Sequence, residues 1–162
     1  MEAVYRPRFS RWIMGMYWVI LGLMVSIVLV AIAFSGMGPL PFAILAVAFS
    51  GISVLIAFIM LRAYMMRFTI TAKDITIEGV FRKSVIKRSD IKSIEKTPIP
   101  FGFRLFGASF LGGLYYLPGI GKAWVSMGNF EDGVMITTKQ KGHYVITPQK
   151  PHEFIKRAKG RS

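Results

Sequence analysis

The acidic residues of this 162-residue chain are too widely scattered to form a catalytic group. Asp74 and Asp90 stand where turns are expected, and such side chains bond the nearby backbone in turns. The chain has no HExxH motif and no Ser, His and Asp in an order typical of nucleophilic catalysis. Gly107 and Gly112 have the glycine spacing of a phosphate-binding loop, but Gly113 follows where that loop requires lysine. We therefore expect no enzymatic activity.

Metal and cofactor chemistry also lacks suitable residues. The chain has no cysteine, which excludes disulfides, thiolate metal sites and a cysteine nucleophile. Its two histidines, His143 and His152, are too few for a convincing metal centre. We expect neither a metal nor a cofactor.

Basic and aromatic residues indicate a different chemistry, which is contact with an anionic surface. The chain holds 21 Lys and Arg against 8 Asp and Glu, a formal net charge of +13. A Lys or Arg near an anionic leaflet contributes about 1 kcal/mol to membrane attraction. The candidates for contact with lipid or a partner are Arg62, Arg67, Arg82, Lys83, Lys87, Arg88, Phe101, Phe103, Arg104, Phe106 and Phe110.

Two other interpretations of the positive charge stay open. A solvated basic surface would serve only orientation and solubility. Nucleic acid is a further ligand class, because the chain is basic and contains aromatic residues. No basic stripe interleaves with aromatic residues on an identifiable platform, so nucleic acid is the less favoured partner.

The elements that must position these residues begin with an uncharged block. Trp12 to Leu61 contains no Asp, Glu, Lys, Arg or His, which is typical of membrane spans. The block divides into apolar runs at 12–34 and 42–61, about 35 Å and 30 Å long as helices. Two glycines and two prolines in Ser35–Pro41 predict a tight turn between them. The pattern predicts a transmembrane helical hairpin.

The flanking charges predict the orientation of this hairpin. Arg6, Arg8 and Arg11 precede the first run, and Arg62 and Arg67 follow the second. The positive-inside rule then places both termini in the cytoplasm, below the inner membrane. A cleaved signal peptide is the alternative, but the apolar stretch is longer than a usual signal-peptide core.

Small residues form stripes on both predicted spans, with Gly15 and Gly22 on the first and Ala46 and Ser50 on the second. Such stripes let helices approach closely in lipid. They favour packing of the two helices on each other, and a docking face for a partner subunit is the alternative. Neither span has an ionisable residue, which argues against a transporter.

The segment from Arg62 to Ser162 reads as strands followed by one helix. Alternation of apolar and polar residues predicts strands at 68–71, 75–81, 84–88, 91–96, 134–138 and 143–147. In the loop between the last two, we expect Gly142 to take a positive φ. Pro151 starts a short helix that ends at Gly160. The fold class is an α+β membrane protein, with a small antiparallel β-barrel or sandwich after the hairpin.

Three motifs carry a family resemblance: 102–107 (GFRLFG), 112–116 (GGLYY) and 147–154 (TPQKPHEF). Together with the order of elements, they resemble the membrane-anchored bacterial PH-like domain proteins. The resemblance implies a PH-like barrel, a membrane location and no known enzymatic activity. Lys150 stands where related sequences often carry Asp or Asn, and this departure weakens the capping of the last helix.

The stretch from Ile99 to Gly121 has three interpretations. A third span is disfavoured, since it holds two prolines, six glycines and Arg104, and would place the basic C-terminal end outside. Some of it, such as Leu114–Tyr116, is expected to supply core strands. A glycine-rich loop that presents phenylalanines to the bilayer or a partner best explains the remainder, because their spacing fits neither one helix nor one strand face.

These observations predict three parts: a basic N-terminus at 1–11, a hairpin at 12–61 and a cytoplasmic PH-like domain at 62–162. We predict that the protein binds anionic lipid head groups or acts as a scaffold for a membrane protein complex, which includes assembly with itself. The alternatives are an accessory subunit of a larger membrane enzyme or transporter and, less favoured, a nucleic-acid-binding membrane protein.

Overall fold

The computed structural model describes residues 2–34, 39–98, 102–108 and 111–160. It divides into two compact units. One is a pair of helices, Arg11–Arg62, and the other is a sheet domain built from Met1–Ser10 together with Ala63–Ser162. The sheet domain is therefore discontinuous in sequence.

The helix pair consists of α1 (Arg11–Ala33) and α2 (Pro39–Tyr64). Both contain a stretch long and apolar enough to cross a membrane, and most side chains in these stretches are exposed. A helix in the core of a soluble protein would instead bury them. α2 begins three residues before the predicted span, within the predicted turn, because Pro39 is compatible with a first helical position. Residues 35–38 of that turn lie outside the described residues.

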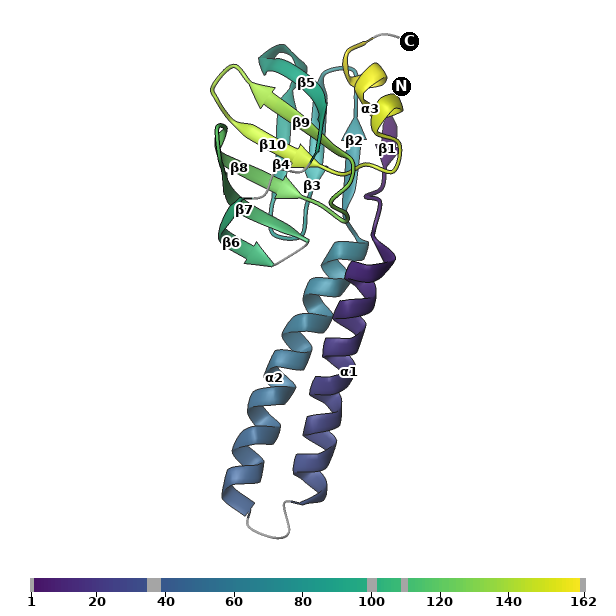
Figure 1. Cartoon of the computed structure of the whole chain (residues 1–162). Coiled ribbons are helices and arrows are strands. Elements are labelled where there is room, and N and C mark those ends of the chain that lie inside the picture. The colour runs from purple at the N-terminus through teal and green to yellow at the C-terminus, as the bar shows by residue number, and fades with distance from the viewer. Residues whose placement is uncertain (1, 35–38, 99–101, 109–110, 161–162) are drawn as a thin grey trace. The chain divides into compact units, whose positions relative to one another are not determined.

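The first sheet of the domain has four antiparallel strands in the order β1-β2-β3-β4 (Figure 1). Their bounds are β1 Ala3–Tyr5, β2 Arg67–Ile70, β3 Asp74–Glu78 and β4 Lys83–Lys87. Side chains along β3 alternate between buried and partly exposed, as the alternating sequence predicted.

The second sheet has six strands in the order β5-β9-β10-β8-β7-β6. Their bounds are β5 Ile91–Thr97, β6 Phe103–Ala108, β7 Gly112–Leu117, β8 Gly121–Ser126, β9 Gly133–Thr138 and β10 His143–Ile146. The β8–β10 pair is parallel and the others are antiparallel. A 3-10 turn, η2 (Arg88–Asp90), leads into β5, and α3 (Pro151–Ala158) ends the domain.

The main core lies between the two sheets and under α3. It joins Phe68 and Ile75 of the first sheet to Ile136 and Ile146 of the second, and all four are almost fully buried. Phe154 of α3, 0% exposed, completes it. The sheets pack as a sandwich and do not close into a barrel, so the sandwich form of the predicted fold is confirmed.

The structure differs from the sequence predictions at the N-terminus. Ala3–Tyr5, placed in a separate basic segment by the sequence, pairs with β2 and belongs to the sheet domain. Three residues carry too little pattern to identify a strand, and the pairing partner lies more than sixty residues away.

The stretch from residue 99 to 121 is a hairpin and not a span, over its described residues 102–108 and 111–121. The loop predicted to present phenylalanines is strand β6, paired with β7. In the β9–β10 loop, Lys141 takes the positive φ, 60°, that was expected of Gly142.

Candidate membrane-contact site

A β-bulge places two phenylalanines of β6 on one face of the second sheet. Phe103 pairs with Tyr116 and Phe106 pairs with Leu114, with a register shift between Arg104 and Phe106. Without the shift, residues three apart on a strand would point to opposite faces. The bulge therefore overturns the expectation that this spacing cannot fit one strand face.

These phenylalanines are highly exposed, at 77% for Phe103 and 59% for Phe106. Tyr116, their neighbour on β7, is 50% exposed. Since directly paired residues share a face, the next pairings add Lys122, opposite Tyr116, and Trp124, opposite Leu114. We call the surface of Phe81, Phe103, Phe106, Leu114, Tyr116 and Trp124 the aromatic face.

The aromatic face is a continuation of the hydrophobic core. Trp124 pairs with Tyr144, Tyr144 with Ile136, and Ile136 with Ile94, so all four lie on the same side of the sheet. Ile136 and Ile94 are buried against the first sheet, whereas β6 at the other edge is exposed. The first sheet thus covers one end of this face, whereas Phe103 and Phe106 at the β6–β7 end stay largely exposed.

The turn between β3 and β4 reaches across this face as far as the edge strand β6. The ring of Phe81 meets that of Phe106 edge-on, with centroids 5.7 Å apart. The guanidinium carbon of Arg82 lies 4.8 Å from the centroid of the Trp124 ring. The first sheet thereby contributes one aromatic ring and one cation to the surface.

The segment of the chain that carries most of the aromatic face has basic residues and no acidic ones. Between Glu95 and Glu131 the chain has no acidic residue, while Arg104 and Lys122 lie on β6 and β8 and are exposed. Arg104 pairs with Tyr115, so it points to the opposite side of the edge strand from Phe103. Burial raises the pKa of the Tyr115 hydroxyl, and the nearby Arg104 charge opposes that rise.

Three predicted cations lie on the first sheet and meet acidic partners there. Lys83 Nζ is 2.7 Å from Glu78 Oε1, and Arg67 pairs with the other oxygen of the same carboxylate. The hydrogen bond from Lys83 is the main reason that the pKa of Glu78 is lowered. Lys87 is the cross-strand partner of Asp74. The charges of Arg67 and Lys83 are thus partly neutralised within the domain.

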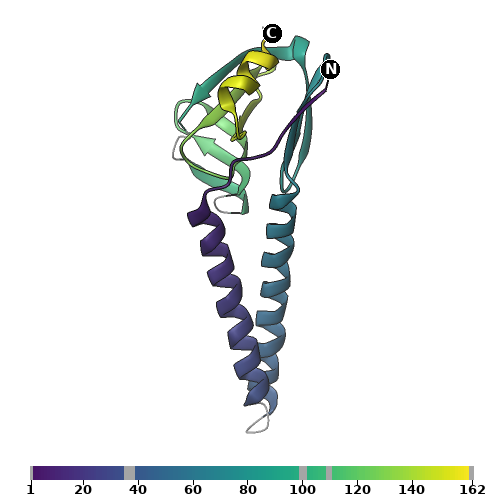
Figure 2. The same cartoon turned by 90° about the vertical axis from the view of Figure 1, so that its right-hand side faces the viewer.

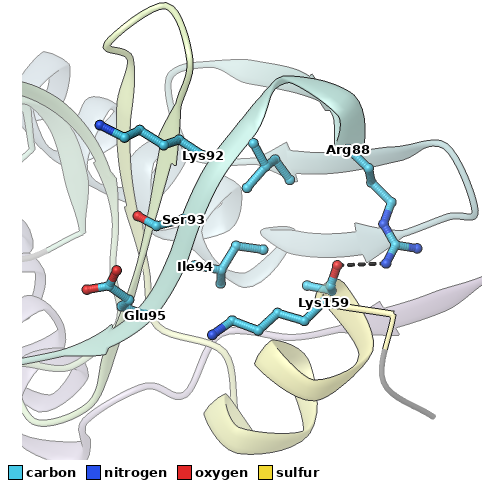
Figure 3. A pocket seen from close by; sticks show the side chains of 8 residues that line it. Arg88, Lys92, Ser93, Ile94, Glu95 and Lys159 are labelled. Carbon is cyan, nitrogen blue, oxygen red and sulfur yellow. Dashed lines mark hydrogen bonds between the residues drawn. The ribbon is translucent and has the colours of Figure 1, made fainter.

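Arg88 has a structural contact at the end of α3. Its guanidinium donates to the carbonyl oxygens of Ala158 at 2.7 Å and Arg157 at 3.2 Å, in the last turn of α3. The last carbonyls of a helix have no acceptor role in its regular hydrogen-bond pattern, so such a donor stabilises the helix end. Figure 3 shows this contact beside an open groove of about 420 Å³. The groove is lined by Arg88, Ile91, Lys92, Ser93, Ile94, Glu95, Ala158 and Lys159. The contact indicates that Arg88 stabilises the end of α3.

The remaining predicted candidates fall elsewhere. Arg62 belongs to the helix pair, in the last turn of α2. Phe101 and Phe110 lie outside the described residues. Within the described part of the chain, no three His, Asp or Glu side chains gather as a metal site would require.

Sequence reasoning did not include Phe81, Tyr116, Lys122 or Trp124 among the contact candidates. The strand that carries Tyr116 was expected to supply core, and its neighbours Tyr115 and Leu117 do so. The alternate residues of β7 and β8 lie on a partly exposed face because the first sheet covers only part of the second. No local sequence pattern indicates how far that cover extends.

Comparison with known proteins gives the class of the domain. Residues 66–162, more than half of the chain, match the bacterial PH domain family. The chain belongs to this family, which confirms the resemblance seen in the sequence motifs. Two helices that are long and apolar enough to cross a membrane accompany the domain, and this order is consistent with a membrane-anchored PH-like protein. No curated protein and no solved structure matches the chain.

Proposed function

We propose that the PH-like domain binds an anionic membrane surface through its aromatic face. The observation that carries this proposal is the cluster of exposed rings with cations beside it and no acidic residue between Glu95 and Glu131. The proposed role is binding, non-enzymatic and without a cofactor.

The energetics of a membrane interface favour this arrangement. Tyr and Trp rings suit the head-group level, where an apolar ring meets a polar layer. Each Lys or Arg near an anionic leaflet adds about 1 kcal/mol. Arg82, over the Trp124 ring, and Lys122, opposite Tyr116, lie on the aromatic face and are placed to do so. The side chain of Phe103 is 77% exposed. If this surface met only water, such an exposed apolar ring would contribute no stabilising contact.

The same proposal includes the sidedness of the protein. Basic residues flank both ends of the hairpin, and the loop between its helices has none. The positive-inside rule supports an inner-membrane protein whose domain lies in the cytoplasm. The inner leaflet, which is negatively charged, is then the nearest surface for the aromatic face.

Trp124 provides a direct test in the full-length protein. The other two tryptophans, Trp12 and Trp18, lie in α1, so replacing both by Phe leaves one reporter on the aromatic face. The protein is reconstituted into phosphatidylcholine vesicles with or without phosphatidylglycerol, with bromine-labelled acyl chains as the quencher. We expect stronger quenching of Trp124 in the anionic vesicles, and a decrease of that quenching at high salt.

Two variants sharpen the result. Phe103→Ser with Phe106→Ser is expected to abolish the extra quenching, because both rings leave the face. Val85→Ser, which changes a 60% exposed valine on β4, is expected to leave it unchanged. Equal quenching in neutral and anionic vesicles, or equal effects of the two changes, would contradict the proposal. A role as a protein scaffold would instead show Trp124 responding to a co-purified partner.

A further inference from the structure

The segment before α1 is built into the sheet domain. Figure 2 shows this purple segment crossing the domain beside β2. Ala3 and Tyr5 of β1 are 8% and 7% exposed, and both are part of the main core. The Tyr5 ring meets Phe154 of α3 edge-on at 5.3 Å, and its hydroxyl donates to Glu153 at 3.3 Å. We call residues 3–10 the strap.

Backbone hydrogen bonds hold the strap along its length. Beyond the β1–β2 pairing, bonds tie it to the chain after β8 and after β10. They run from Gln149 N to Arg6 O at 3.0 Å, Arg8 N to Thr147 O at 2.9 Å, and Ser10 N to Gly128 O at 2.7 Å, with Asn129 Nδ2 donating to Arg8 O at 2.8 Å. The last of the strap residues is also the last residue before α1.

The surface that receives the strap is closely fitted. A Cβ on Gly128 would lie 2.7 Å from Arg8 O and 2.7 Å from a ring carbon of Phe9. The buried hydroxyl of Thr147 accepts from Gly128 N at 2.8 Å and fixes the backbone there. Asn129, 3% exposed, accepts from the amides of two following residues while it donates to the strap. These groups form a seat for the strap.

The segment that follows α2 belongs to the same sheet domain as the strap. Met66, 2% exposed, donates its backbone N–H to Ala63 O at 3.1 Å, and β2 starts at the next residue. The Phe9 ring of the strap lies 5.8 Å from the ring of Tyr64, the last residue of α2. Both the segment before the hairpin and the segment after it therefore belong to one folded domain.

We infer that the strap is a clasp that closes the PH-like domain across the hairpin. The first sheet of the domain is complete only when β1 has paired with β2. Because β1 precedes α1 and β2 follows α2, this pairing requires both ends of the hairpin to lie on the same side of the membrane. The closed clasp then fixes the spacing of these two ends. The inference goes beyond the family match, which begins at residue 66 and leaves the strap out. It is independent of lipid binding.

Engineered cysteines test the clasp in the full-length protein in its native membrane. The chain has no cysteine, so Val4→Cys with Thr69→Cys introduces a single cross-strand pair. Directly paired residues lie about 5 Å apart between Cα atoms, within disulfide range. A protease site placed in the loop between the helices shows the bond, since the two halves stay joined until reduction.

A matched control places the second cysteine farther along the same sheet. Val4 pairs with Thr69, Thr69 with Thr76 and Thr76 with Val85, so Val4→Cys with Val85→Cys spans three strand spacings, about 14 Å. We expect nearly complete cross-linking at 4–69 and background cross-linking at 4–85. Equal yields in the two proteins would overturn the inference.

A second comparison tests the seat. Thr147→Val removes the acceptor of Gly128 N and is expected to favour the open strap by about tenfold. Thr138→Val removes a similar acceptor of Gly142 N, at 2.9 Å, in the β9–β10 turn. We expect slower 4–69 cross-linking for Thr147→Val and an unchanged rate for Thr138→Val. Equal slowing in both would show general destabilisation and contradict a specific seat.

Discussion

The guanidinium carbon of Arg82 lies 4.8 Å from the centroid of the Trp124 ring, and this contact joins the two sheets of the domain. Arg82 comes from the turn between β3 and β4 in the first sheet, and Trp124 from β8 in the second. A cation–π contact of this kind is worth about 0.5–1 kcal/mol at an exposed site. It keeps a positive charge at the border of the aromatic face.

Removing the Arg82 charge should weaken the lipid contact more than the fold. We expect Arg82→Gln to lower the preference for anionic over neutral vesicles by about 1 kcal/mol, because one cation near the surface is lost. Arg82→Lys should retain most of the preference, since it keeps the charge. The measurement is Trp124 quenching as phosphatidylglycerol content rises, and a larger loss for Lys than for Gln would contradict the account.

The β6–β7 hairpin depends on a glycine that approaches the facing strand. Gly113 has φ +145°, and a Cβ there would collide with the carbonyl oxygen of Phe106. We expect Gly113→Ala to lower the free energy of unfolding by about 1–3 kcal/mol, through backbone strain and displacement of β6. Gly119→Ala, with φ +77° but open space around it, is the control and should cost less. Chemical unfolding of the full-length protein in detergent, followed by Trp124 emission, compares the two.

The regular elements of the domain could be predicted because their residues carry local patterns. Ile75 and Ile77 alternate with polar residues and predict β3, and Pro151 with the apolar Phe154 and Ala158 predicts α3. As expected from Lys150 at the N-cap position, no side chain caps the N-terminus of that helix.

The missed features depend on distant parts of the chain. β1 is a strand because β2 and Phe154 complete its surroundings, and three residues alone could not indicate this. The exposed phenylalanines of β6 share a face because of the bulge after Arg104, which breaks the period of two on which strand prediction rests. The parallel pairing of β8 with β10 likewise has no local signature.

Arg88 is expected to matter for stability, since it fills the role of a helix cap. We expect Arg88→Met to lower the free energy of unfolding by about 1–2 kcal/mol, because the final carbonyls of α3 lose a charged donor. Lys87→Met, an exposed neighbour on β4, is the control and should change it by less than about 0.5 kcal/mol. Unfolding of the two full-length variants under the same conditions gives the comparison, and similar values for both would contradict a capping role.

The domain should lose stability in acid because of Glu78. Its folded-state pKa lies below the ordinary value of 4.5, owing first to the hydrogen bond from Lys83. The stabilisation is therefore fully present above pH 4.5 and is lost as the pH falls from that value through the lowered pKa. Glu78→Gln should flatten this part of the stability profile. Unfolding at a series of pH values below 5 checks it, and an unchanged slope in the variant would contradict the assignment.

The depth of residue 103 in a bilayer tests the central claim most directly. Since the chain has no cysteine, Phe103→Cys carries a single spin label on the aromatic face, and Val85→Cys carries one on the outer side of β4 as the control. Collision rates with lipid-soluble oxygen and a water-soluble nickel chelate are compared in anionic vesicles. The account predicts that the label at 103 meets oxygen and is shielded from the chelate, while the label at 85 shows the reverse. A label at 103 as accessible to the chelate as the one at 85 would contradict it.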